Sequence, residues 1–544
     1  MSSERSARSC GTNMLMISIL ITVLILPNFY SVTSAYTLAS RKTSQEPSSP
    51  SSIAQIPALI EGAPAPQKER IIVILAELAD VSNSTSVSAI NSTVFQIMAS
   101  YYDEVSYHEM ALTGNTTNWI PMPNDTVQYG HDMGVVDPDS WWLIRDIIEM
   151  TDNSTNFANY DVVIVVHSGG DQAASSISND IWSAYWSGLD IPTNDGVTIT
   201  NGIVVSEQDP MGIFAHEFGH SLGLPDLYNT DGGGEYVGKW DLMAEGAWLG
   251  TPQGTSPSHL TSWCKIQMGW ISANASLVGR IDQGVIDPLE TNGNNFTVMK
   301  IPVTTDTCYL VEVRQKIHYD SYLPATGVLI LYCDETRASG EGIVTVKYSQ
   351  SLTMATYTTA PGNNIYTDGG RNINITVLSA YSQSYRVSVG LINPDNTPPN
   401  IDLRYPVPGT WPSTQPATVR AVITDTGTDS SSVRNATLLY SSDELRTWNR
   451  IQMSAGSGDL YSAVIPRQNS SQVYYYVEAY DYAGNLAIAN NSGNYYAYGR
   501  VEETITVLAL SIIFIGLASG MVAVFWQRKS RPKEEAQPAM KLET

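Results

Sequence analysis

Gly212–Asp226 reads GIFAHEFGHSLGLPD, and no other stretch constrains the structure of this chain as strongly. In a helix, His216 and His220 lie four residues apart on one face, where their two imidazoles can hold one metal ion. Glu217 lies one residue further round the helix and can reach a metal-bound water without binding the metal itself. The spacing therefore predicts a metal-binding helix that carries its own general base.

Two residues beyond the helix complete the predicted site. Gly223 lets the chain leave the helix through a backbone conformation that other residues resist. Asp226 follows three residues later and can return a carboxylate oxygen to the ion as a third ligand. Three protein ligands leave one zinc position open for water, which is typical of a catalytic site. A buried, hydrogen-bonded histidine pair in a core helix and a closed structural zinc site are the alternatives.

Length and composition describe an ordered chain of several domains. Its 544 residues exceed one typical domain, and 43% hydrophobic against 15% charged residues is typical of a packed protein. The net charge of −24 comes from 53 acidic and 29 basic residues with no basic stripe, so we expect no nucleic-acid partner. Four cysteines are too few for a disulfide scaffold. Cys308 and Cys333 lie in strand-like runs, which leaves a cross-strand disulfide open, and Cys264 is then a small buried residue.

The N-terminal region carries targeting and linker signals. Met14–Leu26 is apolar, follows two arginines and ends at Pro27, which predicts a secretory signal peptide over residues 1–35. An uncleaved anchor is the alternative. Residues 36–68 are rich in Ser, Pro, Ala and Gln, which is typical of a tether or a short pro-segment.

Residues 69–278 alternate between strand and helix patterns. We expect buried strands at 71–75, 160–167 and 197–205, and helices at 90–105 and 141–150. This alternation favours an α/β, zincin-like catalytic domain with a sheet behind the metal-binding helix. His167 ends the second strand, where it is either a cleft residue or, more commonly, a histidine satisfied within the fold.

Two features follow the metal-binding helix. Leu227–Gly234 forms a loop rich in oxygen donors, where a structural calcium ion and a simple solvated turn are both open. Met243 lies in a glycine-bounded turn, where a methionine provides an adaptable apolar floor below the ligands or serves as an ordinary core residue.

The remaining chain is predicted to be β-rich and anchored in a membrane. Short strand runs separated by turn residues favour a β-sandwich over 279–396 and an immunoglobulin- or fibronectin-like domain over 397–500. Residues 504–526 are apolar and uncharged, and basic residues open the tail at 527–544. We therefore expect one C-terminal transmembrane helix in a single-pass cell-membrane protein, with the catalytic domain outside and the C-terminus cytoplasmic.

Together these residues resemble the immune inhibitor A-like zinc metallopeptidases, secreted enzymes related to the zincins. The resemblance covers about residues 70–392 and rests first on His216–Asp226 followed by Trp240–Gly246. Further blocks of this family's type are Pro257–His259 leading to Trp263–Lys265 and Gly269-Trp270, and Glu312–Gln315.

The resemblance implies a role for each residue of the motif. It implies zinc bound by His216 and His220, with Glu217 as catalytic base and acid and Asp226 as third ligand, although Asp241 and Glu245 compete with Asp226. It also implies a methionine turn at Met243 and structural calcium. The tyrosine found two residues after this methionine in better-known relatives is replaced by Glu245, which leaves Tyr228 and His259 as candidates for stabilising the oxyanion.

We therefore predict a cell-surface zinc endopeptidase that hydrolyses peptide bonds of extracellular proteins by a zinc-bound water that Glu217 activates. The alternative is a non-catalytic surface adhesin or cell-wall protein, whose β modules bind partners around a structural or vestigial zinc site. The intact Glu217 favours the enzyme, because a scaffold does not need a general base.

Overall fold

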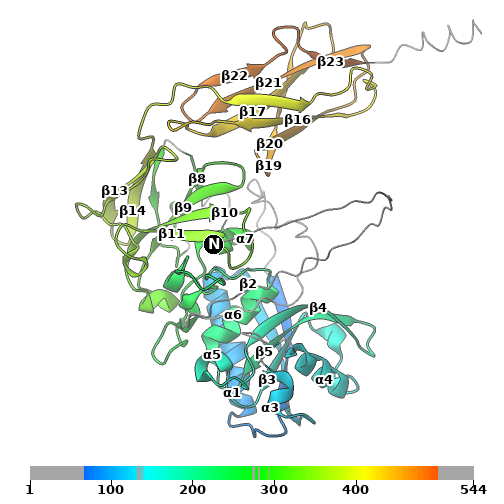
Figure 1. Ribbon diagram of the computed structural model, residues 1–544, viewed down its shortest axis with the longest axis vertical. Helices are drawn as coiled ribbons and strands as arrows, with labels where there is room; N and C mark the ends of the chain where they lie inside the picture. The colour runs from blue at the N-terminus through cyan, green and yellow to red at the C-terminus, as the bar shows by residue number, and fades with distance from the viewer. Residues whose placement is uncertain are drawn as a thin grey trace, which may run out of the picture. The chain divides into compact units, whose positions relative to one another are not determined.

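The computed structural model describes residues 67–131, 137, 139–271, 276–279, 282–291 and 293–499 (Figure 1). The predicted signal peptide, nearly all of the Pro/Ser-rich segment, and the stretches 504–526 and 527–544 lie outside the described residues. Strands in several sheets are the predominant secondary structure, and helices are short.

A five-stranded sheet with the order β2-β1-β3-β5-β4 carries the metal-binding helix. The neighbouring pairs among β1, β2, β3 and β5 are parallel, and β4 lies antiparallel to β5 at one edge. Its strands are β1 (Gln67–Glu77), β2 (Met110–Pro121), β3 (Val162–His167), β4 (Ala184–Pro192) and β5 (Thr198–Ser206).

This sheet is buried on both faces because its central strands contain continuous apolar runs, such as residues 71–76 of β1. In β1, Ile71, Val73 and Leu75 face one hydrophobic cluster, while Ile72 and Ile74 face another. The first cluster includes the metal-binding helix α6 (Met211–Ser221), and the second includes α4 (Trp141–Thr151). The sheet therefore separates two helical layers and holds α6 on one of its faces.

The other helices are short segments. The helical run of α1 (Val87–Ser92), a π-helical turn (Thr93–Met98) and α2 (Ala99–Val105) shares the cluster of α6. The remaining α-helices are α3 (Thr126–Tyr129), α5 (Gln172–Ser175) and α7 (Ser262–Gln267).

Two further sheets pack against each other and against the α6 layer. The first has the order β11-β10-β9-β8-β6 and the second the order β12-β13-β14-β7. Alternate residues of β9 and β10 face either the α6 cluster, as Leu310 and Leu331 do, or the interior between the two sheets, as Val311 and Ile330 do. The strands are β6 (Ser276–Val278), β7 (Asp282–Ile286), β8 (Val298–Pro302), β9 (Thr307–Arg314), β10 (Gly327–Asp334), β11 (Val344–Lys347), β12 (Ile365–Asp368), β13 (Ile373–Tyr381) and β14 (Ser384–Gly390).

The last described region contains two sheets around their own hydrophobic cluster. One has the order β15-β16-β20-β19, and the other has the order β18-β17-β21-β22 with β23 paired to β21. The strands are β15 (Asn400–Tyr405), β16 (Ala417–Thr424), β17 (Val433–Ser441), β18 (Asn449–Gln452), β19 (Ser454–Gly456), β20 (Leu460–Ile465), β21 (Gln472–Asp481), β22 (Leu486–Ala489) and β23 (Tyr496–Gly499).

The predicted fold class and localisation need correction. We predicted an α/β catalytic domain in a chain that ends with a transmembrane helix, whereas the structure is mostly β-strands in several sheets. No helix among the described residues is long and apolar enough to cross a membrane, which contradicts the predicted single-pass membrane protein. The longest single α-helices there, α4 and α6, have 11 residues each. They are about 16 Å long, roughly half of a ~30 Å hydrocarbon layer.

Some of the strands and helices were predicted correctly from the sequence, and other strands were missed. The three buried strands at the centre of the first sheet are confirmed as β1, β3 and β5, and the helices at 90–105 and 141–150 are confirmed within a few residues. The two edge strands β2 and β4 escaped prediction, because both are partly exposed and carry mixed polar residues. The domain boundaries remain predictions, since one hydrophobic cluster joins α6 to β9 and β10.

Candidate metal centre

The metal-binding helix is a buried element of the core rather than a surface helix. In α6 every residue from Met211 to Gly219 is buried. The helix ends at Ser221, and Gly223 follows with φ of +93°, a left-handed conformation that glycine adopts without strain. The chain then turns back, so that the residues after the helix pass beside its last turn.

Both histidines of α6 have their Nδ1 atoms held by backbone carbonyls. His216 Nδ1 lies 3.0 Å from the Leu242 carbonyl oxygen, and His220 Nδ1 lies 2.8 Å from that of Leu224. A carbonyl oxygen only accepts hydrogen bonds, so each Nδ1 carries the proton and each Nε2 keeps its lone pair. These hydrogen bonds leave both Nε2 atoms ready to bind a metal ion.

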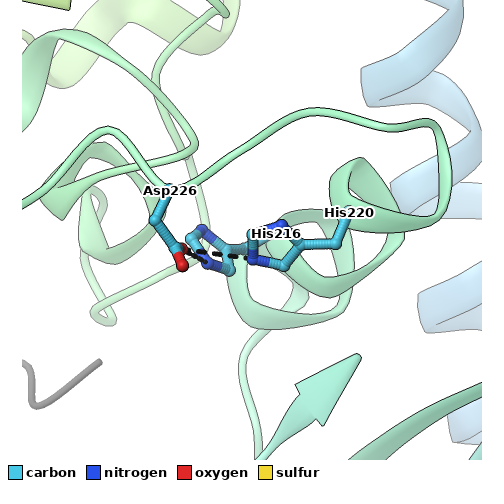
Figure 2. Close-up of side chains that lie close together, drawn as sticks. All are labelled: His216, His220 and Asp226. Carbon is cyan, nitrogen blue, oxygen red and sulfur yellow. Dashed lines mark ion pairs between the residues drawn. The ribbon is translucent and has the colours of Figure 1, made fainter. Parts of the chain in front are cut away.

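Asp226 brings a carboxylate oxygen to the same point. Its Oδ1 lies 3.4 Å from His216 Nε2 and 3.2 Å from His220 Nε2, and the three side chains converge in Figure 2. One ligand atom from each residue lies within 4.8 Å of the others. Asp226 Oδ1 is buried and has no hydrogen-bond partner among the described residues.

These three residues fit a zinc ion. Ligand atoms about 2.0–2.2 Å from a tetrahedral ion lie roughly 3.3–3.6 Å apart, which agrees with the two separations from Asp226 Oδ1. Burial works to lower the pKa of His220, but the Asp226 carboxylate outweighs burial and raises that pKa. Burial conversely works to raise the pKa of Asp226, and His220 and His216 outweigh it and lower that pKa. The cluster therefore attracts positive charge, which a divalent cation supplies while the imidazoles stay neutral.

The competing acids do not reach this point. Asp241 is fully buried, and its two oxygens accept hydrogen bonds from the backbone N–H groups of Met243 (2.7 Å) and Thr261 (2.6 Å). Glu245 is not part of the cluster of metal-ligating atoms found among the described residues. Of the three acids that the sequence left open, Asp226 is the one beside both imidazoles.

The methionine turn lies directly beside α6. Met243 is fully buried, and a Cβ added to Gly219 would lie 2.6 Å from its sulfur, so the thioether packs on the helix backbone. The backbone of this turn contacts the ligands, because Leu242 accepts from His216 and the Met243 carbonyl accepts from Leu227 N–H at 2.8 Å. The turn thus supports the site through its carbonyl groups as well as its apolar side chain.

Glu217 lines a small cleft together with His216. Glu217 is 7% exposed. The other lining residues are Asp171, Ala173, Trp182, Ser183, Ile213, Tyr228, Ala244, Ala247 and Trp248. Asp171 and Ser183 escaped the sequence analysis. The position of Asp171 shortly after the buried strand β3 was the signal that could have identified it, because residues just beyond the carboxyl ends of strands often line a cleft.

Buried acids lie behind the cleft. Asp209 accepts hydrogen bonds from the Ser183 hydroxyl (2.6 Å) and the Ser206 N–H (2.8 Å). Burial first, and the neighbouring Asp171 second, raise the pKa of Asp209 well above its usual range. The raised pKa favours the protonated form of Asp209 and so limits the negative charge near Glu217.

The candidate oxyanion residues are placed very differently. Tyr228 lines the cleft, and its ring centroid lies 6.2 Å from that of His216. His259 is fully buried, with its Nε2 2.7 Å from Glu104 Oε1 and its Nδ1 3.2 Å from Lys265 Nζ, and it does not line the cleft. His167 is also fully buried and lies outside the cleft lining.

The loop after Asp226 is closed by its own hydrogen bonds. Asn229 donates to the Gly234 carbonyl at 3.1 Å and accepts from Asp231 N–H at 2.9 Å. Calcium binding in this loop remains a prediction. Cys308 and Cys333 are direct partners across β9 and β10, and the structure has both as free thiols; Cys264 is buried, as predicted.

Part of this chain is similar in sequence to known peptidases. Residues 160–271 match the model of the immune inhibitor A peptidase M6 catalytic domain. Immune inhibitor A of Bacillus thuringiensis subsp. alesti is 28% identical over 207 residues, which cover 30% of each chain. The pre-pro-metalloprotease PrtV of Vibrio cholerae serotype O1 (strain M66-2) is 25% identical over 217 residues, covering 32% of this chain and 24% of PrtV. Among solved structures, catalytically inactive OgpA of Akkermansia muciniphila in complex with an O-glycopeptide superposes with a TM-score of 0.26 at 10% identity, covering 82% of this chain and 97% of OgpA.

The matched domain is a peptidase catalytic domain, PrtV is a metalloprotease, and residues 160–271 include His216, His220 and Asp226. The matched part of the chain resembles the immune inhibitor A-like metallopeptidases, as its motif suggested. It spans less than a third of the length of these two curated relatives.

Proposed function

We propose that this chain is a zinc endopeptidase that cleaves protein or peptide substrates at the cleft beside α6. The observation that carries the proposal is the meeting of two imidazole Nε2 atoms and a buried Asp226 Oδ1 at one point. The Nδ1–carbonyl hydrogen bonds prepare the imidazoles for a metal rather than for a role in packing. The matches to metalloproteases support the same reaction class.

His216, His220 and Asp226 would hold the zinc ion. Bound zinc supplies Lewis acidity, which polarises the scissile carbonyl and makes water acidic enough to attack at neutral pH. Three protein ligands suit a catalytic rather than a closed structural site.

Glu217 is the general base of the proposed mechanism. It follows His216 directly on α6 and lines the same cleft, so its carboxylate is available to an attacking water. Glu217 accepts a proton from that water and returns it to the leaving amine nitrogen. Because Glu217 itself is buried, its carboxylate can keep this proton from bulk water between the two transfers.

Tyr228 is the proposed donor to the oxyanion. Its phenol is the hydroxyl-bearing aromatic group of the cleft, and it lies beside the ring of His216. A hydrogen bond from this hydroxyl would strengthen as negative charge develops on the substrate oxygen.

The test is casein hydrolysis by the purified chain with and without a chelator, repeated for two variants. Glu217→Gln should bind zinc as the wild type does and lose hydrolysis. Tyr228→Phe should lower kcat by about 10²–10³-fold with zinc affinity unchanged, which is the usual effect of removing one oxyanion donor. Wild-type hydrolysis by Glu217→Gln, or full activity after zinc removal, would refute the mechanism. Absence of hydrolysis by the zinc-loaded wild type would favour a non-catalytic protein.

A further inference from the structure

The backbone of the third candidate ligand is held by a loop from a different sheet. The Asp226 N–H donates to the Ser339 hydroxyl at 3.0 Å, and the Asp226 carbonyl accepts from the Gly340 N–H at 3.0 Å. Ser339 and Gly340 lie between β10 and β11, more than 110 residues further along the chain. Both backbone polar groups of Asp226 therefore have their partners in this loop.

A third contact fixes the loop against the segment that follows Asp226. The Thr230 N–H donates to the Gly340 carbonyl at 3.1 Å. Gly340 has a φ of +72°, and a Cβ at this position would lie 1.9 Å from the Thr230 Cγ2 atom. A glycine is required here, both for the left-handed backbone and for the close approach.

The opposite side of the same segment is held by the methionine turn. The Leu227 N–H donates to the Met243 carbonyl at 2.8 Å, one residue after Asp226. The ligand segment therefore lies between two supports, the methionine turn and the β10–β11 loop. Asp226 lies on an irregular loop, so no helix orients its carboxylate. Contacts to the surrounding segments therefore have to hold this ligand in place.

We propose that Ser339 and Gly340 are positioning residues for the third metal ligand, so that the β10–β11 loop is part of the active site. They act through the backbone of Asp226 and do not touch the metal. This inference rests on the proposed function, because it assumes that Asp226 binds zinc. Loss of the Ser339 hydroxyl should then weaken zinc binding by about 10–100-fold, the usual effect of removing a group that orients a ligand.

A neighbouring residue provides a matched control. Thr336 lies in the same loop, is exposed, and donates its hydroxyl to Asp334 at 2.6 Å. None of its hydrogen bonds reaches Asp226. Thr336→Ala therefore removes one hydroxyl and one hydrogen bond from the loop, as Ser339→Ala does, without changing the contact to the ligand segment.

The experiment measures the zinc dissociation constant of the full chain by competition with a chromogenic chelator, and the visible absorption spectrum of the cobalt-substituted protein. Ser339→Ala should show the weaker zinc affinity and an altered cobalt spectrum, whereas Ser339→Thr, which keeps a hydroxyl, and Thr336→Ala should both match the wild type. Gly340→Ala should weaken zinc binding at least as much as Ser339→Ala does.

The outcomes separate this inference from the proposed function. If the wild type fails to bind zinc at one ion per chain, the proposed function fails and the inference fails with it. If the wild type binds zinc and Ser339→Ala has the same affinity and cobalt spectrum, the inference alone is overturned. An equal loss in Ser339→Ala and Thr336→Ala would also overturn it, because the loop would then act through general stability.

Discussion

Replacing Arg314 tests how the methionine turn is supported from β9. Arg314 is fully buried and donates to the Trp240 carbonyl at 2.7 Å, at the start of the turn. Its guanidinium also contacts three acids, Asp320 at 2.6 Å, Glu312 at 3.1 Å and Glu290 at 3.3 Å. Arg314→Leu would leave these buried carboxyl groups without their cation.

The expected loss depends mainly on the acid whose ionised form Arg314 stabilises. Burial is the largest influence on the pKa of Glu290 and of Glu312 and raises both, so both groups lean toward the neutral form. Burial also works to raise the pKa of Asp320, but Arg314 outweighs it and the pKa is lowered. Arg314→Leu therefore leaves the buried Asp320 carboxylate without its partner, and removing one partner of a buried ion pair costs about 3–5 kcal/mol of unfolding free energy.

Urea denaturation of the full chain, followed by tryptophan fluorescence, measures this loss. Arg337→Ala is the control, since Arg337 is half exposed in its pair with Asp334 and should contribute only about 0.2–1 kcal/mol. Arg314→Lys keeps the positive charge but lacks the planar guanidinium group. Its loss of unfolding free energy should fall between those of the other two variants. The reasoning is refuted if Arg314→Leu unfolds within about 1 kcal/mol of the wild type, where only exposed ion pairs are expected.

The remaining predictions concern two buried bases that change the stability of the protein in different pH ranges. Burial, with Arg314 next in effect, lowers the pKa of Lys265 to about 7 from its ordinary 10.5, so the unfolded chain binds more protons between these values. Stability should therefore rise with pH from about 7 toward 10.5, and Lys265→Met should lack this rise in denaturation curves; an unchanged pH slope would contradict the lowered pKa. Burial likewise lowers the pKa of His167 to about 4 from 6.5, so wild-type stability should fall by about 3 kcal/mol as the pH drops from 6.5 through 4. His167→Phe should lose less unfolding free energy than the wild type over this pH range. An equal loss in the two proteins would rule the explanation out.

Local sequence patterns were sufficient where the structure depends on local geometry. The pair His216 and His220 could be placed on one helix face because helical spacing is the same in any fold. Buried central strands such as β3 were also predictable, since every residue in Val162–His167 is buried and the run is apolar. The edge strands β2 and β4 were not, because an edge strand is half solvated and its pattern is weak.

For the predicted membrane protein, the sequence pattern was not sufficient. It rested on the apolar composition of residues 504–526, outside the part of the chain that the structure describes, and none of the described helices can span a membrane. The composition of a segment indicates only its free energy of transfer into a membrane and does not show which contacts the segment makes.

By itself, the sequence predicted the helix that carries both histidines, the proposed general base on that helix and the glycine that follows it, because these features depend on contacts within one or two helical turns. Only the tertiary structure brings Asp226 beside both imidazoles, while Asp241 accepts hydrogen bonds from backbone N–H groups elsewhere. It likewise brought Ser339 to the backbone of Asp226 across more than 110 residues of sequence. Such contacts arise from packing one sheet against another, and no periodicity along the chain encodes them.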